Sequence, residues 1–223
     1  MISAIIAAAG TGERMKAETP KVFLQLKDKN ILFYSLATIS KVEEIEHVTV
    51  AVPGEWIQTA RDTIAGIDGL KSVSIIEGGS TRQETVFKAL QELPEDTKTV
   101  VVHDGARPLA SVELFRAVIA CAREHGACVP SLPCQDTVKI VRGGLVEQTL
   151  DRNEVHIIQT PQAFYYDSLL QAHQLADEWN WRVTDDSSLI ERAGRPVTTV
   201  NGESGNIKIT HPGDILSATL LLK

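Results

Sequence analysis

The sequence has few cysteines and no long apolar run. The three cysteines, Cys121, Cys128 and Cys134, form no Cys-x-x-Cys pair. We therefore expect no metal binding by cysteine and interpret all three as small buried residues of a reducing compartment. No stretch approaches the roughly 20 apolar residues of a membrane helix, and the N-terminal MISAIIAAAG lacks the basic start of a signal peptide. We expect a cytoplasmic protein that does not associate with membranes.

Basic residues are also scarce. The 223 residues include 22 Lys and Arg against 29 Asp and Glu, which gives a net charge of −7. This balance argues against binding to nucleic acid or anionic membranes, because both need a broad basic face. A local basic pocket is still allowed. The apolar fraction of 43% is sufficient for a proper core, and the length fits one large domain or two small ones.

Apolar, β-branched runs alternate with segments of helical period along the chain. We expect strands at 3–8, 47–52, 72–76, 99–103 and 127–132, and helices at 31–41, 56–65, 81–93 and 112–125. Helices at 167–179 and 184–193, short strands at 196–200 and 206–210 and a helix at 211–223 follow. Continuous apolar strands are typical of a mainly parallel sheet covered on both faces. We predict one three-layer α/β domain, residues 1–223.

Residues 134–164 break this alternation. Alternating apolar residues flank Gly143 and Gly144, a pattern typical of a β-hairpin. The hairpin has no helix of its own to pack against. It could fold over its own sheet or reach a second copy of the chain.

The loop 10–21 follows the first predicted strand and contains two glycines, Arg14 and the pair Pro20-Lys21. Loops at the carboxyl ends of parallel strands bind ligands, and their glycines bring backbone N–H groups close to phosphate. The loop does not match the dinucleotide-binding motif, because Met15 occupies the position of the third glycine. It does not match a Walker loop either, because no Gly-Lys-Ser/Thr sequence follows. The nearby cations favour a triphosphate ligand over a structural turn.

Two further loops are expected at the same sheet edge. Asp104 follows a buried strand, where a carboxylate could hold Mg²⁺, and Arg107 is placed to contact an anion. The alternative for Asp104 is a helix cap or turn. Gly78 and Gly79 precede Ser80-Thr81, where a helix N-terminus begins. His103 we interpret as a structural residue.

The motifs G-T-G-E-R-M, P-K, G-G-S-T-R-Q-E-T-V, H-D-G-A-R-P, D-R-N, Q-T-P-Q-A-F and N-I-K-I-T occur in this order over nearly the whole chain. Together they resemble the cytidylyltransferases, most closely the family that acts on 2-C-methyl-D-erythritol 4-phosphate in the non-mevalonate isoprenoid pathway. The resemblance implies a Rossmann-like three-layer α/β/α nucleotidyltransferase fold with an inserted β-hairpin arm. The chain ends after one domain and so resembles the monofunctional form.

The resemblance also implies a role for each matching residue. The implied nucleotide-binding residues are Ala8, Ala9, Gly10, Thr11, Gly12, Gly79, Ser80, Arg82 and Thr85. The implied catalytic residues are Arg14, Lys21 and Lys208. Those implied around the sugar-alcohol phosphate are Asp104, Arg107, Thr137, Arg152, Thr160 and Lys208, with Asp104 also the Mg²⁺ ligand.

The arm, about residues 134–155, is expected from the resemblance to make a homodimer. In the family the arm is exchanged between subunits, so Thr137 and Arg152 would serve the neighbour's site. The substrates implied are CTP and a sugar-alcohol phosphate, with Mg²⁺ as cofactor.

Three alternatives remain open. The sister family uses ribitol 5-phosphate, although the GARP sequence and the arm resemble the methylerythritol branch more closely. A dinucleotide-dependent oxidoreductase would share the alternating pattern but lacks the third glycine, and Pro53 follows the second strand instead of an acidic residue. A non-catalytic nucleotide sensor would not need Lys21, Asp104 and Lys208.

No general base stands out, and none is needed, because the attacking phosphate is already mostly dianionic at neutral pH.

Overall fold

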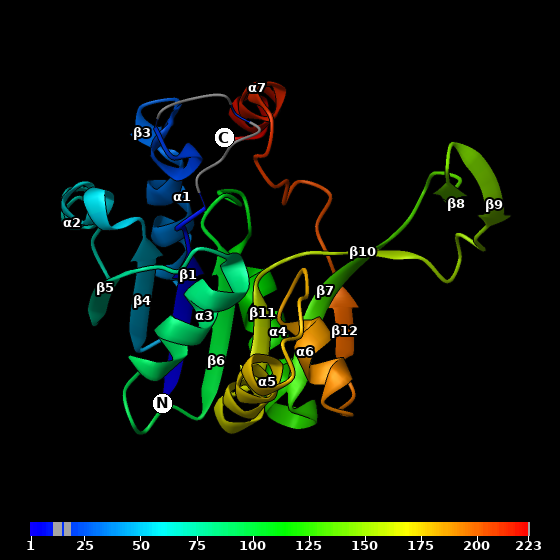
Figure 1. Ribbon diagram of the computed structural model, residues 1–223. Coiled ribbons are helices and arrows are strands. Elements are labelled where there is room, and N and C mark those ends of the chain that lie inside the picture. The colour runs from blue at the N-terminus through cyan, green and yellow to red at the C-terminus, as the bar shows by residue number, and fades with distance from the viewer. Residues whose placement is uncertain (11–14, 16–18, 223) are drawn as a thin grey trace.

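A computed structural model describes residues 1–10, 15 and 19–222. Its central sheet has eight strands. They are β1 (Ile2–Ala7), β4 (His47–Val52), β5 (Val73–Glu77), β6 (Thr99–Asp104), β7 (Ala127–Pro133), β10 (His156–Ile158), β11 (Gln162–Tyr165) and β12 (Thr198–Asn201). The strand order is β10-β7-β11-β6-β1-β4-β5, and β12 pairs with β7 (Figure 1).

The strands β1, β4, β5 and β6 form a parallel part of the sheet, and the predicted ligand loops follow β1, β5 and β6. Strand β1 lies between β4 and β6 and is parallel to both, and β4 is parallel to β5. The antiparallel strands are β11, which pairs with β6 and β7, and β10, which pairs with β7. Every residue of β4 and β6 is buried, as the continuous apolar runs predicted. The three-layer α/β fold expected from the sequence is confirmed.

Helices cover both faces of the sheet. On one face lie α1 (Ile31–Ile39), α2 (Ile57–Ala65) and α4 (Val112–His125), and on the other lie α3 (Arg82–Gln91), α5 (Tyr166–Glu178) and α6 (Ser187–Arg192). The strand period of two divides the side chains between these layers, so Ala4 and Ile6 pack in the first core and Ile5 packs in the second. The last helix, α7 (Pro212–Leu221), contributes Ala218 to a third, smaller cluster.

The predicted hairpin forms a separate two-stranded sheet, β8 (Lys139–Arg142) and β9 (Leu145–Thr149). Its turn needs glycine at both central positions, because φ is 56° at Gly143 and 81° at Gly144. The hairpin projects from the body of the molecule beyond β10 (Figure 1). It therefore does not fold over its own sheet, which was one of the two arrangements left open by the sequence.

Two sequence predictions near the C-terminus are wrong. Residues 206–210 are not a strand, because Ile209 N donates to Ala106 O at 2.9 Å in an irregular segment that buries Ile209 and Asn206. Helix α6 begins at Ser187 and not at 184, because the residues before it form a capping loop in which Asp185 accepts hydrogen bonds from Ser187 and Ser188.

Short elements escaped the sequence patterns as well. These are β10, β11 and the small ladder of β2 (Gln25–Leu26) and β3 (Lys29–Asn30). Within the described part of the chain, no helix combines the length and the apolar character needed to cross a membrane.

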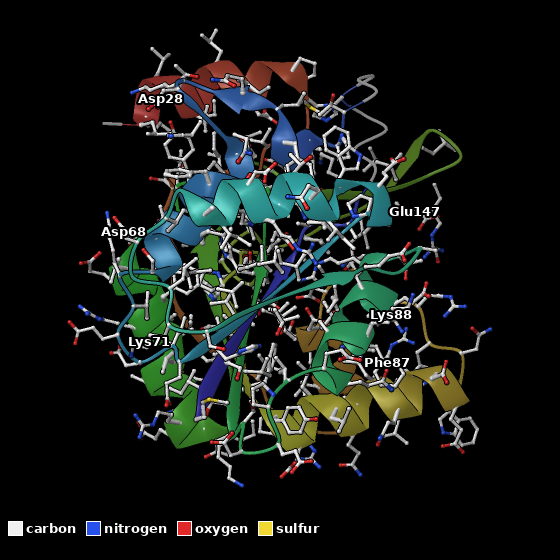
Figure 2. All side chains as sticks on the ribbon, turned by 90° about the vertical axis from the view of Figure 1, so that its left-hand side faces the viewer. Asp28, Asp68, Lys71, Phe87, Lys88 and Glu147 are labelled. Carbon is white, nitrogen blue, oxygen red and sulfur yellow. The ribbon has the colours of Figure 1, made fainter. Side chains whose placement is uncertain are left out.

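Charged side chains that take no part in the sheet lie at the periphery, as Asp28, Asp68, Lys71 and Lys88 show (Figure 2). Among the described residues, the buried carboxylates are instead Asp104, at the carboxyl end of β6, and Asp186, just before α6.

Candidate active site

The loops after β1, β5 and β6 meet at one edge of the sheet. The register of β1 and β6 sets Ala7 beside Asp104. The loop after β5 approaches the loop after β1 so closely that a Cβ atom on Gly78 would lie 2.2 Å from the Cβ of Ala9. Only glycine fits this approach, which explains the residue type at position 78.

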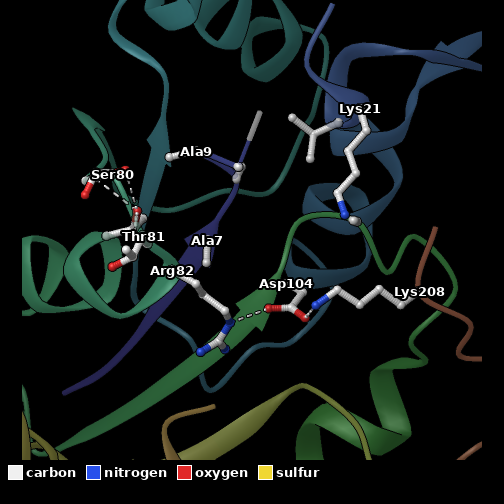
Figure 3. Close-up of a pocket in the computed structure, with 14 residues that line it drawn as sticks. Ala7, Ala9, Lys21, Ser80, Thr81, Arg82, Asp104 and Lys208 are labelled. Atoms are coloured by element: carbon white, nitrogen blue, oxygen red, sulfur yellow. Dashed lines mark hydrogen bonds and ion pairs between the residues drawn. The ribbon is translucent and has the colours of Figure 1, made fainter. Parts of the chain in front are cut away.

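A cavity of about 300 Å³ lies between these loops. Most of the residues that the sequence predicted for nucleotide binding and catalysis line it, together with Asp104. They are Ala8, Ala9, Gly10, Lys21, Gly79, Ser80, Arg82, Thr85 and Lys208. Figure 3 shows Lys21 and Lys208 directed toward Asp104 from different segments. Among the described lining residues are three cationic side chains and one carboxylate, so 3 − 1 gives these residues an excess of two positive charges in an acidic protein.

Asp104 is the centre of this charged cluster. Its Oδ1 accepts from Arg82 Nε at 2.8 Å, and its Oδ2 accepts from Lys208 Nζ at 2.6 Å. Burial by itself would raise the pKa of the Asp104 carboxyl, but the charges of Arg82 and Lys208 and the hydrogen bonds they donate hold that pKa well below its usual range. The carboxylate is therefore ionised at neutral pH.

Arg82 joins two carboxylates across the cleft. Besides the bond to Asp104, its NH1 donates to Asp186 Oδ2 at 2.7 Å. Burial would lower the pKa of Arg82, but the charges of Asp186 and Asp104 raise it above its usual range. The NH2 group is buried and has no hydrogen-bond partner among the described residues. One guanidinium nitrogen, NH2, therefore remains for a ligand.

The loop before α3 is held by its own helix. Thr81 caps the helix by accepting from Glu84 N at 3.1 Å, and Glu84 Oε2 accepts from both the N–H and the hydroxyl of Ser80. The Thr85 hydroxyl accepts from Gly79 N and donates to the carbonyl oxygen of Thr81. Ser80 and Thr85 thus fix the shape of the cavity wall, a role the sequence did not reveal.

A second cavity of about 360 Å³ adjoins the first. Arg82, Asp104 and Lys208 line both. The second cavity is rich in hydroxyl and amide groups, and its cationic and acidic side chains are equal in number. Its other polar lining residues are Arg107, Gln159, Thr160, Gln162, Thr184, Asp185, Ser187, Ser188 and Glu191.

Thr160 and Arg107 are fixed by the backbone around Asp104. The Thr160 hydroxyl accepts from Asp104 N at 3.0 Å, and Arg107 NH1 donates to Asn206 O at 2.8 Å. His103 bridges the two, with its Nε2 3.1 Å from Arg107 O and its Nδ1 3.3 Å from Thr160 Oγ1. Burial lowers the pKa of His103 to about 4, so the imidazole is neutral, in keeping with a structural residue.

Two groups of predicted site residues are not among the described residues of the cleft. Thr137 and Arg152 lie on the exposed arm, where Arg152 NH1 donates to Gln135 O at 3.4 Å. Thr11, Gly12 and Arg14 lie outside the described residues.

Sequence reasoning missed the acidic and amide residues of the second cavity and the partner of Arg82. The pair Asp185-Asp186 stands next to two serines just before α6. These two adjacent acids beside hydroxyl residues are the sequence feature from which a polar site could have been predicted.

The whole chain can be compared with known proteins. The family model described as 2-C-methyl-D-erythritol 4-phosphate cytidylyltransferase matches residues 2–223. The chain belongs to this family. Relatives of that name from Microcystis aeruginosa and Pelotomaculum thermopropionicum are each 40% identical, over 98% and 100% of this chain and 97% and 94% of their own lengths. The crystal structure of 4-diphosphocytidyl-2C-methyl-D-erythritol synthase from Anaerococcus prevotii is 35% identical, with a TM-score of 0.89, and covers 99% of this chain and 95% of that chain.

Membership of the family establishes the activity. The chain is a cytidylyltransferase that transfers CMP from CTP to 2-C-methyl-D-erythritol 4-phosphate in isoprenoid precursor biosynthesis. Its length matches that of the relatives which carry this single activity in their names. The resemblance stated from the sequence is confirmed, and the oxidoreductase and sensor alternatives fall.

Proposed function

We propose that the first cavity binds CTP, that the second binds 2-C-methyl-D-erythritol 4-phosphate, and that the two substrates react where Arg82, Asp104 and Lys208 line both. The observation that carries this proposal is the shared wall of the two cavities. A transfer between two bound molecules needs adjoining sites with a common boundary at the reacting atoms.

The charge of each cavity suits its substrate. The positive excess of the first matches a triphosphate, and the backbone of Ala8, Ala9 and Gly10 offers close approach to it. The balanced charge and the hydroxyl and amide groups of the second match a polyol that carries one phosphate.

The reaction itself needs positioning and charge stabilisation rather than a general base. An oxygen of the alcohol phosphate attacks the α-phosphorus of CTP, the new P–O bond forms, and the bond to the β-phosphate oxygen breaks to release pyrophosphate. Lys21 and Lys208 stabilise the negative charge that develops, since preorganised cations act most strongly on charge in the transition state. Arg14, on the loop after β1, is assigned the same role by its place in the family motif. Arg107 and Thr160 hold the alcohol phosphate.

Asp104 suits a magnesium ion that takes most of its ligands from phosphate and water. No group of three or more His, Cys, Asp or Glu side chains capable of holding a metal occurs in the described part of the chain. A single carboxylate beside a triphosphate site is a common arrangement for Mg²⁺. When bound, the ion would neutralise charge on the triphosphate.

The arm completes the second site from the neighbouring subunit in this proposal. Thr137 and Arg152 lie on the projecting hairpin, whose apolar Val141, Leu145 and Val146 are 55%, 74% and 57% exposed. A hairpin of this kind is marginal by itself. Pairing about a two-fold axis would cover its apolar face and make a homodimer.

The test is pyrophosphate release from CTP and Mg²⁺ with each of two alcohol phosphates under identical conditions. We expect kcat/KM for 2-C-methyl-D-erythritol 4-phosphate to exceed that for ribitol 5-phosphate by a large factor, because a polar site rejects a substrate that leaves its groups unpaired. The dephosphorylated alcohol should not react. A ratio that favours ribitol 5-phosphate would contradict the assignment of the second cavity.

A further inference from the structure

A chain of buried polar contacts continues from the cleft into the protein interior. It starts at Asp104, passes through Arg82 to Asp186, and ends at His173 on α5. Asp186 and His173 are 1% and 2% exposed. Neither residue carries a role in the reaction as proposed above.

The two oxygens of Asp186 have different partners. Oδ2 accepts from Arg82 NH1 at 2.7 Å, and Oδ1 lies 3.2 Å from His173 Nε2. Burial would raise the pKa of Asp186, whereas the charge of Arg82 and the hydrogen bond from His173 lower it. Because an ionised carboxylate can only accept, His173 Nε2 carries the proton and donates it to this contact.

The imidazole is itself held by packing. Its ring stacks on Phe87 of α3, with centroids 5.6 Å apart and an interplanar angle of 9°. Phe87 lies where α3 faces α5 (Figure 2). Five residues earlier, at the start of α3, Arg82 reaches into the cleft. Helix α3 thus carries both the ring that stacks on His173 and the guanidinium that bonds Asp186.

Arg82 depends on Asp186 for its orientation. A guanidinium has five donors in a fixed planar fork, so two carboxylates at Nε and NH1 determine where the remaining NH2 group points. With Asp104 as its single partner, the group could rotate about one contact. His173 in turn limits the carboxylate of Asp186 to one orientation.

We propose that His173 and Asp186 are positioning residues, which hold Arg82 in the orientation that binds the nucleotide. This inference rests on the proposed function, since it takes the first cavity to be the CTP site. The residues act through Arg82 and do not touch the substrate themselves.

Two substitutions at position 173 separate this role from packing. His173→Phe keeps the aromatic stack on Phe87 and removes the donor. His173→Gln loses the ring and keeps an amide donor that can reach Asp186, and the cavity of about 290 Å³ that His173 lines gives the new side chain room. We expect the Kd for CTP, measured by calorimetry without the second substrate, to rise about tenfold in His173→Phe, as for the loss of one hydrogen bond to a charged group. In His173→Gln it should stay within about threefold of wild type.

A packing role gives the opposite order, because the phenylalanine variant would then be the milder one. That order, or equal Kd values in the two variants, overturns the inference. His47→Gln is the matched control. His47 is another buried histidine, bonded to Ser72 and Thr49 at the opposite end of the sheet, and its replacement should lower the melting temperature without changing the Kd for CTP.

A double-mutant cycle keeps the inference testable if His173→Phe folds poorly. Asp186→Asn removes the charged partner of Arg82 and should raise the Kd for CTP roughly 10- to 100-fold. Adding His173→Gln or His173→Phe to it should change the Kd by less than about twofold, because Arg82 has then already lost the charged partner through which His173 acts. Additive losses overturn the inference. A wild-type protein that does not bind CTP overturns the proposed function together with it, whereas a wild type that binds CTP with additive variants overturns the inference alone.

Discussion

The cleft and the arm place their polar residues in opposite surroundings. In the cleft, Asp104 and Asp186 are 6% and 1% exposed and are neutralised by Arg82 and Lys208. In the arm, Leu145 is 74% exposed, and Arg152 contacts a backbone carbonyl of the arm itself. A single chain therefore builds the cleft from its own sheet, whereas the apolar face of the arm has no cover from its own subunit. This difference is the basis of the proposal that one part of the site is made within a subunit and the other between subunits.

Removal of the metal should have the largest effect on activity and leave the fold unchanged. We expect excess EDTA to reduce pyrophosphate release to background, because the charge of the triphosphate is then not neutralised. The melting temperature should not change, since Asp104 is the sole carboxylate proposed to meet the ion and is already paired with Arg82 and Lys208. Activity that persists in EDTA, or a fall in melting temperature, would count against Asp104 as the contact of a substrate-bound metal.

Loss of a cation in the cleft should come next in size. Lys21→Ala should lower kcat by roughly 10²- to 10³-fold at saturating CTP, as the loss of one preorganised charge typically does. We expect the same for Arg14→Ala. Steady-state kinetics with circular dichroism as a folding check would measure this. Lys71→Ala, at a peripheral lysine that donates to Glu43 O, is the control and should keep full activity; near-normal turnover in Lys21→Ala would remove Lys21 from the catalytic role.

Mixed dimers test whether the arm serves the neighbouring cleft. Neither Lys21→Ala nor Arg152→Ala should be active as a pure protein. An equal mixture that is unfolded and refolded should recover about a quarter of wild-type activity, because half of the dimers are hybrids with one intact site of two. No recovery above the sum of the separate variants would mean that each subunit uses its own arm.

A charge on the arm should break the dimer with the smallest effect on the fold. We expect Leu145→Asp to shift the protein from dimer to monomer in sedimentation velocity at micromolar concentration. The near-ultraviolet circular dichroism of the core should be unchanged, since a surface substitution usually alters the free energy of unfolding by no more than about 0.5 kcal/mol. Glu147→Asp, on the same strand, is the conservative control. A wild-type protein that sediments as a monomer would refute arm-mediated dimerisation.

Much of the cleft could be predicted from local sequence. Buried strands at 47–52 and 99–104 follow directly from continuous β-branched runs, and Asp104 stands where such a run ends. The sequence pattern places Gly78 in a loop, but the reason for glycine there is the approach of Ala9, a contact between the loops after β5 and β1. Alternating apolar residues at 206–210 predict a strand, but the structure has an irregular segment there. An irregular segment can show the same alternation of apolar residues as a strand.

The sequence by itself determined the order of strands and helices, the glycine turn of the arm and, through its motifs, the family. The tertiary structure alone decided that Asp104 is shared between Arg82, 22 positions away, and Lys208, 104 positions away. It also decided that Asp186 and His173 stand behind Arg82. The physical reason is that periodicity reports only which face of an element is buried. Ion pairs between side chains depend on the distance between elements, and that distance is fixed when α3, α5 and α6 pack on the sheet.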